Sequence, residues 1–85
     1  MYVNKVTGLT EYETFDELLN ADVVSITEDR NSYYIILKPE QPFDCTVWVV
    51  DKKTEKVAFT HYIQYAINTL DNVTPVDPAK IKRVG

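Results

Sequence analysis

Apolar side chains first recur at helical spacing near residue 15. Phe15, Leu18 and Leu19 stand at positions i, i+3 and i+4, which places them on one face of a short helix over residues 15–20. Thr14 precedes this face, and the carboxylate of Glu17 stands three positions after Thr14, which is the spacing of a capping box. The pattern therefore predicts a short helix near the N-terminus.

Four runs rich in β-branched and aromatic residues follow, and each predicts a strand. They cover residues 22–27, 33–37, 46–50 and 57–60. A short polar turn separates the first run from the second and the third from the fourth, so each pair is expected to form a β-hairpin. Pro39 and Pro42 interrupt the chain between the two hairpins. We therefore expect a four-stranded, mainly antiparallel sheet.

The turn of the second hairpin, residues 51–56, is charged and has no glycine. Turns of this length often place glycine where the backbone is left-handed, and Glu55 occupies about that position here. A non-glycine residue in the left-handed conformation costs about 1 kcal/mol. The sequence therefore predicts local strain at Glu55 if the turn adopts this geometry.

The apolar period changes after residue 60. A helical stripe is formed by Tyr62, Ile63, Ala66, Ile67 and Leu70. The segment 61–67 also fits a period of two, so a long final strand is the alternative. The helix is favoured because Gln64, Asn68 and Asp71 then share one polar face.

These elements predict an α+β fold. A small single domain over residues 1–78 would contain a short N-terminal helix, a four-stranded sheet built from two hairpins and a C-terminal helix. Residues 79–85 would follow as a basic, flexible tail. The candidate core residues share one apolar face of each element: Phe15, Leu18, Leu19, Val24, Ile26, Ile35, Leu37, Val47, Val49, Phe59, Ile63 and Ile67. A shift of one residue in a strand would exchange its two faces.

The composition is that of an ordinary globular protein. The 85-residue chain is 45% hydrophobic and 26% charged, which argues against disorder. No apolar run approaches the roughly 18 residues needed to cross a bilayer, and the first residues lack the apolar stretch of a signal peptide. Cys45 is the single cysteine, so no disulfide can form within the chain. A cytoplasmic location without membrane association is therefore expected.

The net charge of −4 is unevenly distributed. Residues 1–29 carry seven acids and one base, whereas residues 30–85 carry eight bases and six acids. Phosphate groups would be repelled at long range, so nucleic-acid binding is disfavoured. The acidic N-terminal part is instead suited to attract a basic partner.

The sequence offers little for catalysis. With two glycines in the chain, phosphate-binding loops are excluded. His61 is the single histidine, and a pair with Cys45 is the one conceivable nucleophile and base, with no third group marked to orient it. We therefore expect no enzymatic activity and no cofactor. The carboxylates near residue 15 fit helix capping better than a metal site, so no metal is expected either.

Aromatic residues supply one set of candidate binding residues. The chain has six tyrosines, more than a core of this size readily hides. Tyr33 and Tyr34 are adjacent on a predicted strand and must point to opposite faces of the sheet. One of them could join Trp48 in an aromatic patch at a protein interface. Packing in the core is the plainer alternative. A weak single-strand nucleic-acid binder is another, with Lys38, Lys52, Lys53 and Lys56 nearby.

Acidic residues supply the second set. Glu11, Glu13, Asp16 and Glu17 lie close together in the sequence and predict a surface for a basic partner. An acidic inhibitor or nucleic-acid mimic that docks on a basic groove is the sharper form of this hypothesis. No motif is specific enough to indicate a family. The sequence therefore predicts a small acidic cytoplasmic protein-binding or regulatory module, with an unidentified protein or a second copy of the chain as its partner.

Overall fold

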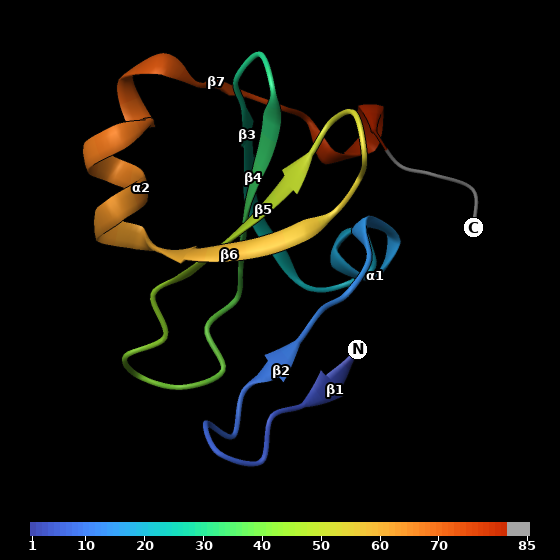
Figure 1. The fold of residues 1–85 in the computed structure, drawn as a ribbon, viewed down its shortest axis with the longest axis vertical. Coiled ribbons are helices and arrows are strands. Elements are labelled where there is room, and N and C mark those ends of the chain that lie inside the picture. The colour runs from blue at the N-terminus through green and yellow to red at the C-terminus, as the bar shows by residue number, and fades with distance from the viewer. Residues whose placement is uncertain (82–85) are drawn as a thin grey trace.

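The computed structural model describes residues 1–81 of the chain, which fold as one compact α+β unit (Figure 1). Its elements, in chain order, are β1 (Tyr2–Val3), β2 (Thr10–Glu11), α1 (Phe15–Leu19), β3 (Val23–Glu28), β4 (Ser32–Leu37), β5 (Thr46–Asp51), β6 (Val57–His61), α2 (Tyr62–Asn68), η1 (Leu70–Asn72), β7 (Thr74–Pro75) and η2 (Pro78–Lys80). Among these residues, no helix has both the length and the apolar character that crossing a bilayer requires.

The main sheet has five antiparallel strands in the order β6-β5-β4-β3-β7. Strands β3 to β6 confirm the two predicted hairpins. The expectation of four strands was wrong because β7 pairs with the outer edge of β3, where Thr74 lies opposite Glu28. Two residues that include a proline carry too little strand signal to be predicted, although proline is tolerated at a sheet edge.

A second, two-stranded sheet precedes the first helix. In it Tyr2 lies opposite Glu11, and the intervening loop is closed by the amide of Gly8 donating to the carbonyl of Asn4 at 2.7 Å. The N-terminal helix is therefore not the first element of the fold. In Figure 1 this pair of strands extends away from the main sheet at the end of the molecule opposite the β3–β4 turn.

The capping box predicted at the start of α1 is confirmed. The Thr14 hydroxyl accepts from the Glu17 amide at 3.1 Å, while a carboxylate oxygen of Glu17 accepts from the Thr14 amide at 3.2 Å. These bonds fix where the helix begins, so that Phe15 and Leu18 face the sheet and are buried.

The principal core lies between α1 and one face of the sheet. It contains Phe15, Leu18, Ile26, Ile35, Trp48 and Val50. The opposite face is covered by α2, and Val47 and Tyr65 are buried there. Both faces of the central strands are therefore covered, as their unbroken apolar runs predict.

The prediction of a core position was wrong for four residues. Val24, Phe59, Ile63 and Ile67 have 62–72% of their surface exposed. Val24 falls at an irregularity in the β3–β4 register, and Phe59 lies on the edge strand β6. The strand pattern suggests that the sheet is covered at both places, but there it is exposed.

Helix α2 confirms the helical interpretation of the last apolar segment, but it is turned differently from the prediction. Its one buried residue is Tyr65, whose hydroxyl lies 2.7 Å from the hydroxyl of Thr27 on β3. The Tyr65 ring packs against Tyr34, with 5.2 Å between ring centroids. The helix is thus attached through aromatic rings, while Ile63 and Ile67 face outward.

The folded unit continues past residue 78, where we expected a flexible tail to begin. Asp77 caps η2 by accepting from the amide of Ala79 at 2.9 Å. Ile81 and Val76 pack against the principal core. The rest of the predicted tail, residues 82–85, lies outside the described residues.

Glu55 has a φ of 60°, which confirms the predicted left-handed residue in the β5–β6 turn. Replacing Glu55 with glycine should raise the free energy of unfolding by about 1 kcal/mol, because glycine adopts this conformation without a Cβ clash. Urea denaturation measures the change. Lys53→Gly in the same turn is the control and should destabilise the protein, since Lys53 has no positive φ to relieve. Equal effects of both substitutions would contradict the strain at Glu55.

Candidate functional site

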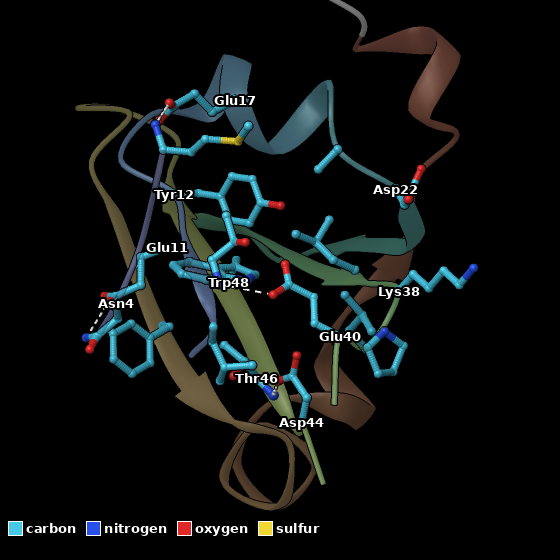
Figure 2. A pocket seen from close by; sticks show the side chains of 18 of the residues that line it. Asn4, Glu11, Tyr12, Glu17, Asp22, Lys38, Glu40, Asp44, Thr46 and Trp48 are labelled. Carbon is cyan, nitrogen blue, oxygen red and sulfur yellow. Dashed lines mark hydrogen bonds and ion pairs between the residues drawn. The ribbon is translucent and has the colours of Figure 1, made fainter. Parts of the chain in front are cut away.

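A groove of about 850 Å³ lies between the N-terminal strands and the principal sheet (Figure 2). One wall comes from Met1, the β1–β2 loop and β2, and another from the connector between β4 and β5. The floor includes Trp48 of β5, and the groove extends to Phe59 of β6 and Tyr62 of α2. Segments that are far apart in the sequence therefore build one concave surface.

The groove has predominantly acidic side chains among its charged lining residues. Its carboxylates are those of Glu11, Asp16, Glu17, Asp22, Glu40 and Asp44, and Lys38 is the one basic side chain among the lining residues. In Figure 2 the side chain of Glu40 lies between the connector and Tyr12, near the middle of the groove. A positively charged ligand would meet carboxylates on more than one wall.

Two hydrogen bonds join the walls. The amide of Thr10 donates to a carboxylate oxygen of Glu40 at 3.1 Å, and the side-chain amide of Gln41 donates to the carbonyl of Thr7 at 3.4 Å. Gly8 makes room for this contact, because a Cβ at Gly8 would lie 3.1 Å from the Gln41 nitrogen. The connector and the β1–β2 loop thus hold each other in place.

Most of this negative charge is not neutralised by the protein. Within residues 1–81, the ion pairs are those of the N-terminal ammonium with Glu17 and of Lys52 with Glu28. Glu11 and Glu40 instead accept from neutral groups, the side-chain amide of Asn4 and the backbone of Thr10. Neutral donors hold these carboxylates in position but leave their charge available to a ligand.

The floor is aromatic. Tyr12 meets Trp48 edge to face with 5.4 Å between ring centroids, and Trp48 lies 5.6 Å from Phe59. Burial raises the pKa of the Tyr12 phenol, and the carboxylates of Glu40, Asp22 and Glu17 raise it further. The protein therefore offers rings that can stack on a cation, within a negative potential.

The structure does not gather Tyr33, Tyr34 and Trp48 on one exposed surface. Tyr33 stacks on Phe15 at 5.2 Å, under the Lys52 ammonium, and Trp48 is 7% exposed in the core. Tyr34 lies on the opposite face of the sheet, as adjacency on a strand predicts. Of the three, Trp48 alone lines the groove.

Tyr34 has a structural role on its own face. Its hydroxyl donates to Asp29 at 2.6 Å. Burial and this carboxylate raise the pKa of Tyr34 to about 12. Burial by itself would raise the pKa of Asp29, but hydrogen bonds from Tyr34, Asn31 and Ser32 outweigh it and lower that pKa. The pair stabilises the β3–β4 turn.

The predicted acidic set is divided by the fold. Glu11, Asp16 and Glu17 line the groove, whereas Glu13 does not. The N-terminal ammonium and the amide of Glu13 hold the pKa of Glu17 below its ordinary value. Sequence reasoning missed Glu40 and Asp44, because the connector that carries them meets the N-terminal strands only in the folded chain. No local pattern marks them.

Cys45 and His61 come near each other at the ends of β5 and β6, where Thr46 pairs with His61. The Nδ1 atom of His61 accepts from the amide of Ile63 at 3.1 Å and caps α2. This bond engages the lone pair of Nδ1. Residues 1–81 hold no group of three or more histidine, cysteine or acidic side chains placed to bind a metal ion.

Comparison of the chain with protein-family models, with curated proteins and with solved structures gave no match. The chemistry of the groove is therefore what indicates a function.

Proposed function

We propose that this protein is a non-catalytic binding module whose acidic groove receives a basic segment of a partner protein. The supporting observation is the arrangement of the carboxylates of Glu11, Asp22, Glu40 and Asp44 around an aromatic floor without ion-pair partners in the described residues. Carboxylates on several walls of one groove give it a negative potential that attracts a cationic ligand.

The size of the groove favours a few side chains of a peptide segment. A volume of about 850 Å³ is within the range of sites that enclose a small ligand and is too small for a folded domain. Arginine suits it best, because a guanidinium can bond a carboxylate in bidentate fashion and stack on an aromatic ring. Tyr12 and Phe59 provide such rings beside the carboxylates.

The concave arrangement favours this function over the alternatives. An acidic inhibitor or nucleic-acid mimic needs carboxylates on a protruding surface that enters a partner's groove, whereas here they line a groove themselves. A nucleic-acid binder would need positive charge beside the rings. Lys52, whose ammonium lies 4.9 Å from the centroid of the Tyr33 ring, is paired with Glu28.

The test is the affinity for a fluorescein-labelled eight-residue peptide of alternating arginine and threonine. The double variant Glu11→Gln, Glu40→Gln keeps the shape of both side chains and one acceptor oxygen on each, and removes two charges. Its dissociation constant should rise about tenfold, which corresponds to about 1.4 kcal/mol. Fluorescence anisotropy at low ionic strength measures it.

The matched control is Glu13→Gln, Asp71→Asn, which removes the same charge from exposed positions outside the groove lining. Its dissociation constant should stay within about twofold of the unaltered protein. Equal weakening in both double variants would show that net charge alone attracts the peptide. That result, or no measurable binding to the unaltered protein, would contradict the proposed function.

A further inference from the structure

Strand β6 forms one outer edge of the five-stranded sheet. It is five residues long, whereas β7 at the other edge has two. No other strand of residues 1–81 pairs with the outer side of β6. Figure 1 shows β6 running along the outside of the sheet before α2 begins.

The register shows which backbone groups of β6 point outward. The amide of Asp51 donates to the carbonyl of Lys56 at 3.0 Å, so these two residues form a hydrogen-bonded pair. Such pairs alternate along an antiparallel ladder, so Ala58 and Thr60 bond to β5. The amides and carbonyls of Val57 and Phe59 therefore point away from the sheet, and no hydrogen bond within residues 1–81 engages them.

This edge lacks the features by which proteins usually protect one. Exposed edges are commonly protected by lysine, proline, a bulge or a covering segment. Between Val57 and His61 there is no lysine, acid or proline, and the pairing of β5 with β6 is regular over its whole length. The β6 edge can therefore accept a further strand.

The β6 edge also borders the groove. Phe59 belongs to β6, lines the groove, and has 63% of its surface exposed. Its ring projects on the same face of the sheet as that of Trp48, the residue opposite it on β5. A residue that pairs with Phe59 from outside would project its side chain on this face as well.

We propose that the basic segment binds as a sixth strand, antiparallel to β6, with basic side chains at every second position directed towards the acidic groove. This inference rests on the proposed function and specifies how the ligand binds. The free backbone groups of Val57 and Phe59 supply hydrogen bonds, and the carboxylates that line the groove supply charge complementarity. Bonds to the backbone hold the segment in an extended form, so successive side chains alternate between the two faces and the basic ones share the face of the groove.

The register determines which amides of the bound segment would bond to β6. In an antiparallel pair, a residue opposite Phe59 both exchanges hydrogen bonds with it and projects its side chain on the same face. The basic residues of the segment are therefore the ones whose own amides bond to β6. Methylation of those amide nitrogens should prevent strand addition, whereas methylation of the intervening residues should not.

The first test measures amide hydrogen exchange by NMR. It compares the free protein with the protein saturated with the peptide of alternating arginine and threonine. The Val57 and Phe59 amides should exchange at least tenfold more slowly in the complex than in the free protein. Ala58 and Thr60 are internal controls, because β5 already protects their amides. Protection of Phe59 in the free protein that grows with protein concentration would show that a second copy occupies the edge, and would overturn the inference.

The second test compares two methylated forms of the same peptide. N-methylation of its two central arginines should weaken binding at least tenfold, and N-methylation of two central threonines should change it less than threefold. Equal affinity of the two forms, without protection of Phe59, would mean that the groove binds the peptide without strand addition. That outcome rejects the inference and leaves the proposed function standing. Absence of binding by every form would instead reject the proposed function.

Discussion

Leu18→Ala should lower the free energy of unfolding by about 3–4 kcal/mol. Leu18 is fully buried at 0% exposure, where α1 meets the sheet. Truncation removes apolar contacts and leaves a cavity that Phe15 and Ile35 cannot fill without moving. Small domains are stable by only about 5–15 kcal/mol, so this one change removes a large share of the total. Urea denaturation followed by far-ultraviolet circular dichroism measures it.

Ile67→Ala is the matched control in the other helix. Ile67 has 72% of its surface exposed, and alanine is the better helix former, so the free energy of unfolding should change by less than about 0.5 kcal/mol. The sequence patterns of the two helices placed both Leu18 and Ile67 in the core. A loss above about 2 kcal/mol for Ile67→Ala would show that α2 packs through its predicted stripe and would contradict the structure.

Tyr65→Ala should have the second large effect, a loss of about 3–5 kcal/mol. Tyr65 is the one buried residue of α2 and is 3% exposed. Its removal takes away the ring contacts with Tyr34 and Tyr62 together with the bond to Thr27. Helix α2 should then separate from the sheet. Thermal unfolding and the loss of amide protection in residues 62–68 report the two consequences.

Tyr65→Phe separates the hydroxyl from the ring. It retains the aromatic packing and removes the 2.7 Å hydrogen bond to Thr27, so a loss of about 1 kcal/mol is expected. Tyr62→Phe is the control at a position with 43% exposure and should be within about 0.5 kcal/mol of the unaltered protein. If Tyr65→Ala cost no more than Tyr65→Phe, the packing of α2 described above would be wrong.

Local signals predicted much of the fold. The capping box at Thr14, the four main strands and the left-handed Glu55 depend on residues within a few positions of one another. The sequence contains the physical cause of each one, such as a hydroxyl that satisfies a free amide or a charged turn without glycine. These features were therefore predicted at or near their true positions.

Features that depend on distant pairing were missed. Strand β7 exists because Thr74 and Pro75 meet β3, and two residues have no strand pattern of their own. The irregular register near Val24 also depends on contacts between distant segments. So does the side of α2 that faces the sheet, which is the side carrying Tyr65. A helix only seven residues long offers too few positions to show which side is buried.

The candidate site was predicted in its charge and missed in its shape. The excess of acids in residues 1–29 indicated a surface for a basic partner, and Glu11 and Glu17 do line the groove. Concavity arises only when the connector carrying Glu40 folds against Thr10. The prediction of an exposed aromatic patch was the least informative. Helix α1 covers the face of the sheet that carries Tyr33 and Trp48, and the sequence does not show this covering.

Fluorescence of Trp48 provides the most direct test of the groove as a binding site for a basic segment. Trp48 is the single tryptophan and lies in the groove floor beside Tyr12, so it reports occupancy without a label. An unlabelled arginine–threonine peptide should produce a saturable change in its emission that weakens as salt is raised, and a glutamate–threonine peptide should produce none. The same change with both peptides, or no change with either, would contradict the account.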